Sequence, residues 1–323
     1  METVWNTLML IGGFLFLVKG ADLFVDGSAA LARHFHVSGV VIGLTIVALE
    51  TSAPELAVSS VAAFQGANEI ALSNVVGSNT FNLLAVLGIC ALIRPVPVDT
   101  GIIKRDYPFS IGATLLVFLL TSVPAVFRGL PENMAETIGD MKRWMGILTL
   151  LLFLGYIAWL IYEAKKHPEK ESHEDVKLSR SILFIVIGLA MIILGGEGVV
   201  RGAKYIASAC GMSETLIGLT IVAVGTSLPE LVTSVVASKK GENGLAVGNV
   251  VGSNIFNLLF ILGVSSTIRP MTVNLASFYD LIILLFVSGI VYIIAIRRKR
   301  LNRSHGVLML TLYAIDVVFA VLR

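Results

Sequence analysis

Two glutamates, Glu55 and Glu230, lie near the middle of long apolar segments, and each directly follows a proline. Residues 39–64, 69–93, 214–238 and 244–268 contain no Lys or Arg, so a salt bridge within these segments is not available. An ionised carboxylate at the centre of a membrane costs at least ~2.5 kcal/mol. A bound cation would offset that cost. We prefer this interpretation to a pair of protonated glutamates in a dry interior, because both segments keep the same polar residues around the glutamate.

The polar residues around the glutamates supply only oxygen. A proline inside a helix leaves backbone carbonyls without partners, and broken membrane helices direct such carbonyls at cations. An all-oxygen set with two negative charges suits calcium or sodium rather than zinc or copper. The expected oxygens are the carbonyls of Glu50, Thr51, Gly225 and Thr226, the carboxamides of Asn82 and Asn257, and the hydroxyls of Ser52, Ser78, Ser227 and Ser253.

This polar set occurs twice. Residues 43–95 return as residues 218–270, at an offset of 175 without a gap, and 32 of the 53 positions are identical. The same offset relates Gly20 to Gly195 and Gly27 to Gly202. For Asn74 and Asn249, hydrogen bonding between helices and cation binding are equally open. We assign the repeated glycines of the central segments to close packing of membrane helices: Gly77, Gly88, Gly252 and Gly263.

The composition is that of a polytopic membrane protein, with 56% hydrophobic residues, 14% charged residues and a mean hydropathy of +0.87. A bilayer core needs about 20 apolar residues per helix. We therefore predict an all-α membrane protein with ten transmembrane helices, the first of which is retained rather than cleaved as a signal peptide. The spans are residues 4–32, 39–64, 69–93, 106–127, 143–163, 180–209, 214–238, 244–268, 277–297 and 305–322.

An odd number of spans in each copy makes the two halves inverted repeats of five helices. The predicted boundaries are residues 1–163 for the first repeat, 164–179 for a hydrophilic linker and 180–323 for the second repeat. Loops on the linker side hold 16 Lys and Arg residues, and loops on the other side hold seven. The positive-inside rule then places the linker in the cytoplasm and both termini outside the cell membrane. No basic face suggests nucleic acid, and nothing requires a protein partner.

The duplicated signatures G-T-S-L-P-E and G-N-x-x-G-S-N resemble the α-repeats of the sodium/calcium exchanger family, in the cation/calcium antiporter superfamily. The resemblance implies that Glu55 and Glu230 bind calcium and sodium alternately, and that Thr51 and Thr226 offer backbone carbonyls. Asn82 and Asn257 match positions where the family has Asn or Asp, and two neutral residues there resemble the potassium-independent members. The flanking sodium positions match Ser52, Ser227, Ala48, Ala223, Ser78 and Ser253.

The first repeat departs from this pattern at two positions. Glu50 stands where the second repeat has Gly225, and Ser73 stands where it has Gly248. A third carboxylate within about one turn of Glu55 would favour uptake of a proton or a cation by the cluster. Glu50 is therefore a possible modulator of transport.

The sequence thus predicts an antiporter that exchanges sodium for calcium by alternating access, without an enzymatic activity or a cofactor. No ATP-binding motif is present, so the sodium gradient would drive the exchange. A proton-coupled calcium or cation antiporter is the nearest alternative, although the G-N-x-x-E-H motif of proton/calcium exchangers is absent. An intramembrane hydrolase using Glu55 and Glu230 is more remote, since no nucleophile or metal constellation lies in the spans. A channel is disfavoured by inverted repeats around a site in the middle of the membrane.

Overall fold

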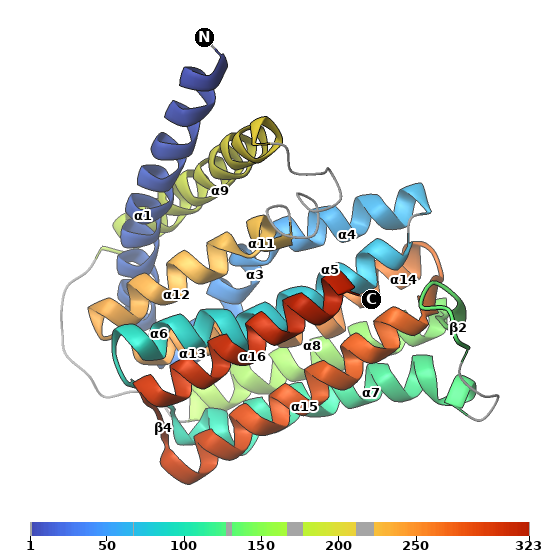
Figure 1. The fold of residues 1–323 in the computed structure, drawn as a ribbon. Coiled ribbons are helices and arrows are strands. Elements are labelled where there is room, and N and C mark those ends of the chain that lie inside the picture. The colour runs from blue at the N-terminus through green and yellow to red at the C-terminus, as the bar shows by residue number, and fades with distance from the viewer. Residues whose placement is uncertain (1, 67, 127–130, 167–176, 211–222, 323) are drawn as a thin grey trace.

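The computed structural model describes residues 2–66, 68–126, 131–166, 177–210 and 223–322, which form a bundle of helices (Figure 1). The first half contains α1 (Glu2–His34), α2 (Gly39–Ile42), η1 (Gly43–Val47), α3 (Ala48–Thr51), α4 (Ala53–Gln65), α5 (Asn68–Phe81), η2 (Asn82–Val86), α6 (Leu87–Ile93), β1 (Val96–Pro97), η3 (Ile102–Asp106), α7 (Tyr107–Val126), β2 (Thr137–Met141) and α8 (Arg143–Lys166). The second half contains α9 (Leu178–Ala209), α11 (Ala223–Thr226), α12 (Leu228–Lys240), α13 (Asn243–Ile255), η5 (Phe256–Ile261), α14 (Leu262–Ile268), β3 (Met271–Asn274), α15 (Leu275–Arg298), β4 (Arg300–Leu301) and α16 (Arg303–Leu322). The η elements are π-helical turns.

Most of the predicted spans appear as helices of membrane length. Within the described residues, seven helices are long and apolar enough to cross a bilayer, and the helix of residues 39–51 forms an eighth span together with α4, at a bend of 48°. The predicted fourth span corresponds to η3 and α7. The predicted seventh span begins in residues 211–222, outside the described residues, and its described part is α11 and α12. Much of the predicted linker, residues 167–176, also lies outside them.

Two short strand ladders join the repeats at opposite ends of the bundle (Figure 1). β1 pairs with β4, with Val96 opposite Leu301, and β2 pairs with β3, with Met141 opposite Met271. β1 and the start of β3 are related by the offset of 175. Each of these strands therefore pairs with a strand of the other repeat, as expected for two intertwined, inverted halves.

The two longest helices, α1 and α9, pack along each other on one side of the bundle (Figure 1). Glycines let their backbones approach closely. A Cβ atom added to Gly20 would lie 2.8 Å from the Gly188 carbonyl oxygen, and one added to Gly195 would lie 2.7 Å from the Gly13 carbonyl oxygen. Any side chain at these positions would force α1 and α9 apart.

The predicted packing role of the central glycines is correct at three of the four positions. A Cβ atom at Gly252 would lie 2.7 Å from the Leu44 Cα, one at Gly263 would lie 2.7 Å from the Leu150 Cγ, and one at Gly88 would lie 3.2 Å from the Leu310 Cγ. A Cβ atom at Gly77 would meet nothing within 4 Å among the described residues. Leu219, the counterpart of Leu44 under the offset of 175, lies outside these residues, so the packing role of Gly77 stays a prediction.

The most enclosed spans lie at the centre of the bundle. In residues 243–268, 94% of the most apolar 18-residue window is buried, and the value is 78% in residues 70–93, against 33% or less in the other long spans. A span that neighbours cover on all sides can carry polar side chains without presenting them to lipid. These two central spans carry the repeated G-S-N motifs.

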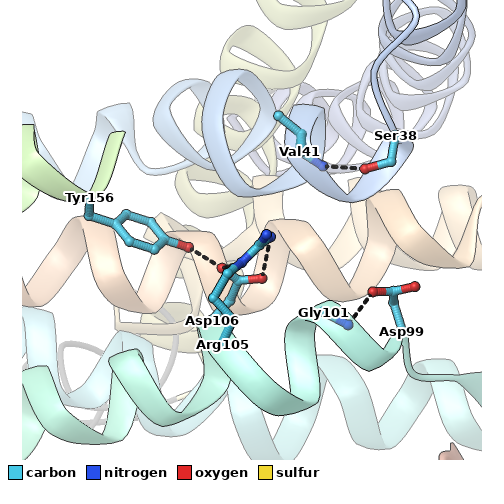
Figure 2. Close-up of polar contacts among 7 residues, drawn as sticks. All are labelled: Ser38, Val41, Asp99, Gly101, Arg105, Asp106 and Tyr156. Carbon is cyan, nitrogen blue, oxygen red and sulfur yellow. Dashed lines mark hydrogen bonds and ion pairs between the residues drawn. The ribbon is translucent and has the colours of Figure 1, made fainter. Parts of the chain in front are cut away.

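A second polar centre lies at the linker end of the bundle, where the carboxylate of Asp106 is fully buried. Arg105 donates to Asp106 from Nε at 2.8 Å and from a terminal nitrogen at 3.0 Å, and the Tyr156 hydroxyl of α8 donates at 3.0 Å (Figure 2). The Arg105 guanidinium also lies 5.0 Å from the ring centre of Trp159. This network ties η3 to α8.

Candidate functional site

Each glutamate lies in the first turn of a helix that begins after a break in the span. The breaks are at Ser52 (φ −85°, ψ 9°) and Ser227 (φ −92°, ψ 9°), and α4 and α12 start at the next residue. Pro54 and Pro229 therefore occupy the start of a new helix, where the missing N–H is not needed, rather than a helix interior as predicted from the sequence. The positive end of the helix dipole favours a carboxylate at this position. The sequence interpretation did not include this contribution.

The two repeats hold each other's glutamates. The Ser52 hydroxyl donates to Glu230 Oε1 at 2.8 Å, and the Ser227 hydroxyl donates to Glu55 Oε1 at 2.8 Å. All four side chains are completely buried. Because the offset of 175 relates Ser52 to Ser227 and Glu55 to Glu230, the two bonds are equivalents across a pseudo-twofold axis.

The remaining predicted hydroxyls are arranged less symmetrically. Ser78 donates to Glu55 Oε1 at 3.3 Å and accepts a hydrogen bond from Ser227 at 3.1 Å. Its counterpart Ser253 lies 3.5 Å from the Thr51 hydroxyl. Glu55 therefore accepts hydrogen bonds from two serines, and the two ends of the site are not identical.

Four buried oxygens of the site make no hydrogen bond within the described part of the chain. They are Glu55 Oε2, Glu230 Oε2, Asn82 Oδ1 and Asn257 Oδ1. The π-helical turn η2, which begins at Asn82, packs against the Glu230 helix α12, and η5, which contains Asn257, packs against the Glu55 helix α4. Buried acceptors without donors are costly. Two carboxylate and two carboxamide oxygens are ligands that a hard cation would satisfy.

The structure places the other predicted site residues close to the helix breaks. Thr51 is completely buried, and its hydroxyl donates to Asn249 Oδ1 at 3.0 Å. Thr226 ends α11 and is half-buried, and Ala48 is buried at the start of α3. Ala223 is the first residue of α11 and lies at the edge of the described residues.

Glu50 belongs to α3, on the other side of the helix break from Glu55. It is half-buried in α3, and the described residues contain no group of three or more His, Cys, Asp or Glu side chains that could share a metal ion. The described residues therefore contain no metal-holding cluster of the three carboxylates, and the role of Glu50 as a modulator stays a prediction.

The amide nitrogens of Asn74 and Asn249 form hydrogen bonds between neighbouring helices. Asn74 Nδ2 donates to the Ser59 hydroxyl at 3.0 Å, and Asn249 Nδ2 donates to the Ser234 hydroxyl at 3.0 Å. These bonds link α5 to α4 and α13 to α12. The sequence left open hydrogen bonding between helices and cation binding for these two residues, and the structure shows the hydrogen bonding.

Sequence reasoning missed two residues at the centre of the site, Asn79 and Asn254. They are fully or almost fully buried, and they hydrogen-bond to each other's backbone and to Asn82 and Asn257. The signal was present, because both residues belong to the G-S-N motif and are identical in the two repeats.

Comparison with known proteins places this geometry in context. Residues 5–162 and 180–322 match the family model described as sodium/calcium exchanger protein. The chain is 37% identical over 317 residues to a putative antiporter, CaxA, from Alkalimonas amylolytica, a match that covers 94% of this chain and 95% of the relative. It is 32% identical over 341 residues to the sodium/calcium exchanger MaX1 from Methanosarcina acetivorans, with 97% of both chains covered.

The fold also matches a solved structure. The sodium-calcium exchanger NCX_Mj, soaked with 10 mM Na⁺ and 10 mM Sr²⁺, superposes with a TM-score of 0.82 at 32% identity, and the match covers 98% of both chains. The prediction of an all-α membrane protein with ten helices in two inverted five-helix repeats is confirmed.

Proposed function

The chain belongs to the sodium/calcium exchanger protein family, and from that premise we propose that it exchanges sodium for calcium across the membrane by alternating access. It is an integral membrane transporter and not an enzyme. The coupling to sodium and the choice of calcium are our proposal. They are supported by the relatives named sodium/calcium exchangers and by the chemistry of the site.

One observation carries this proposal: the four buried oxygens of Glu55, Glu230, Asn82 and Asn257 that have no donor among the described residues. Two ionised carboxylates give the site a charge of −2, which one calcium ion or two sodium ions would balance. Both are hard cations that prefer oxygen ligands. A single set of oxygens can therefore hold either ion in turn, as exchange requires.

The remaining residues are assigned by position. Around the four central oxygens, we propose that Thr51 and Thr226 contribute backbone carbonyls at the helix breaks. Flanking sodium positions would involve Ser52, Ser227, Ala48, Ala223, Ser78 and Ser253. In the present state the two serines at the breaks donate to the glutamates. An arriving cation would compete with these bonds for the carboxylate oxygens.

We further propose that residues 1–163 and 180–323 act as the two inverted repeats, joined by a cytoplasmic linker at residues 164–179. Both termini would face the outside of the cell membrane. The excess of Lys and Arg on the linker side supports this orientation.

Calcium-45 uptake into vesicles tests the proposal. Vesicles containing the purified protein are loaded with sodium, and uptake is measured with and without an outward sodium gradient. Uptake that depends on the sodium gradient is the expected result. Uptake that instead follows a proton gradient, and is abolished by a protonophore, would favour the proton-coupled alternative.

The same vesicles test the expected independence from potassium. Asn82 and Asn257 are both neutral, so the site provides no further charge for a potassium ion. Exchange should run at the same rate with potassium or with a large organic cation as the background ion. An absolute requirement for potassium would contradict the roles given to Asn82 and Asn257.

A further inference from the structure

Asn79 and Asn254 connect the two repeats at the centre of the molecule. Asn79 Nδ2 donates to the Asn254 carbonyl at 3.1 Å, and Asn254 Nδ2 donates to the Asn79 carbonyl at 3.4 Å. Asn79 lies on α5 and Asn254 on α13, and the offset of 175 relates them. Together they form a reciprocal bridge across the pseudo-twofold axis.

Each bridge residue also holds one carboxamide of the ion site. Asn79 Oδ1 accepts from Asn257 Nδ2 at 3.0 Å, and Asn254 Oδ1 accepts from Asn82 Nδ2 at 3.3 Å. The oxygens at the other ends of these carboxamides are Asn82 Oδ1 and Asn257 Oδ1, which have no donor in the part of the chain that the structure describes. The bridge therefore engages the nitrogen end of each site carboxamide and leaves the oxygen end for a cation.

The chemistry of the bridge decides which end of each amide faces the site. A backbone carbonyl only accepts hydrogen bonds, so the Asn79 NH₂ group must face the Asn254 carbonyl. The Asn79 Oδ1 atom then faces Asn257 and can be paired only by its NH₂ group. A flipped Asn79 amide would place its Oδ1 against the Asn254 carbonyl, and a flipped Asn257 amide would place its Oδ1 against Asn79 Oδ1. Both orientations are excluded, because each would bring two acceptors together. The orientation of Asn257 Oδ1 is thus set by a backbone carbonyl two contacts away.

We propose that Asn79 and Asn254 are positioning residues that orient the carboxamide oxygens of Asn257 and Asn82 toward the transported cation. The proposal rests on the proposed function and names two residues outside its ligand set. Without the bridge, each site carboxamide could rotate and present its NH₂ group to the cation. That orientation repels a cation and would weaken binding.

A double-mutant cycle between Asn79 and Asn257 separates this role from simple helix packing. Aspartate at position 257 has two equivalent oxygens and needs no orientation. It would also face the acceptor Asn79 Oδ1, so removing Asn79 would relieve a repulsion. We expect Asn79→Ala to weaken calcium binding about tenfold in the wild-type background, since ~1.4 kcal/mol corresponds to a factor of ten. In the Asn257→Asp background the same change should weaken binding less than about twofold, or strengthen it.

The measurement is the calcium-45 dissociation constant of the purified protein in detergent. The matched control is Thr80→Val on the same helix, because the buried Thr80 hydroxyl donates only within α5, to the Val76 carbonyl at 3.1 Å. The control should change the dissociation constant by less than about twofold. An equal loss of affinity on Asn79→Ala in both backgrounds would overturn the proposal and leave Asn79 as a packing residue.

The symmetry-related pair provides a second, independent cycle if Asn79→Ala folds poorly. Asn254→Ala should weaken calcium binding, and Asn82→Asp should remove most of that effect. Melting temperatures of all variants, measured without calcium, report whether Asn79 and Asn257, and likewise Asn254 and Asn82, stabilise the fold together in the absence of an ion. A wild type that binds calcium but does not exchange it for sodium would refute the proposed function and leave both cycles interpretable.

Discussion

Two regions of this molecule bury carboxylates, and they do so in different ways. Asp106, at the linker end of the bundle, accepts two hydrogen bonds from Arg105 and one from Tyr156. Glu55 and Glu230, at the centre, accept hydrogen bonds from serine hydroxyl groups, and each retains one buried oxygen without a donor among the described residues. All three carboxylates are completely buried.

The difference separates a structural charge from a functional one. A buried charge must be paired or hydrogen-bonded to be tolerated. At Asp106 the chain provides its own cation, Arg105. At Glu55 and Glu230 the described residues provide helix dipoles and hydroxyls, and under the proposed function the transported ion balances the two negative charges.

The largest expected effect comes from neutralising one central glutamate. Glu55→Gln or Glu230→Gln should abolish sodium-dependent calcium uptake while the protein stays folded, because a divalent ion loses its strongest ligand and half of the balancing charge. Uptake of calcium-45 and elution in size-exclusion chromatography check the two parts of this prediction. Normal sodium-dependent uptake in either variant would contradict the shared-site model.

Neutralising the structural carboxylate should lower the stability of the protein and leave calcium uptake nearly unchanged. Asp106→Asn removes the counter-charge that lies 2.8 Å from the half-buried Arg105 guanidinium, and we expect the free energy of unfolding to fall by about 1–3 kcal/mol. Uptake per folded molecule should stay within about twofold of the wild type, since Asp106 lies outside the ion site. Thermal unfolding in detergent and calcium-45 uptake measure the two quantities. Lost uptake with unchanged stability would break the distinction between the two regions.

A smaller effect is expected at an ion pair between α1 and α12. Lys240 lies 2.7 Å from Asp26 Oδ1 and 3.4 Å from Asp22 Oδ1, where α1 packs against α12 at the linker end. In the other repeat the position of Lys240 is occupied by Gln65, and the described parts of α4 and α9 make no comparable contact. We therefore expect the ion pair to stabilise the access state in which α1 and α12 are in contact as they are in this structure.

Lys240→Gln would make the second repeat like the first at this position. Exposed ion pairs contribute about 0–1 kcal/mol each, so the equilibrium between the two access states should shift by up to about fivefold. The ratio of the apparent calcium KM values on the two membrane faces reports this shift. Lys240→Arg keeps the charge and serves as the matched control. Equal ratios in all three proteins would show that the ion pair has no influence on the transition.

The smallest effect is expected at Glu50, where the repeats differ in charge. Because Glu50 lies beyond the helix break from Glu55, and the described residues contain no metal-holding group of three carboxylates, Glu50→Gly should shift the pH profile of calcium uptake only slightly. If Glu50 instead shares a proton with the central glutamates, Glu50→Gly should clearly shift acid inhibition of uptake to lower pH. Profiles of wild type, Glu50→Gly and Glu50→Gln decide between these outcomes, and the Gln variant controls for the weaker helix that a glycine causes. A shift of about one pH unit in both variants would show that Glu50 titrates together with the central glutamates.

The sequence alone determined the architecture and most of the candidate ligands. Apolar length predicts membrane helices, and an odd number of spans per repeat predicts inversion, whatever the contacts are. Glu55, Glu230, Asn82 and Asn257 were identifiable because polar residues kept in both copies of an apolar segment need an explanation.

The tertiary structure decided which of these residues touch one another. The offset of 175 shows that Ser52 and Ser227 are equivalent, but not that each binds the glutamate of the other repeat. The offset likewise gave no sign that Asn79 and Asn254 meet across the pseudo-twofold axis. The physical reason is that periodicity and repetition describe each helix by itself, whereas a contact between repeats depends on how two distant segments pack in three dimensions.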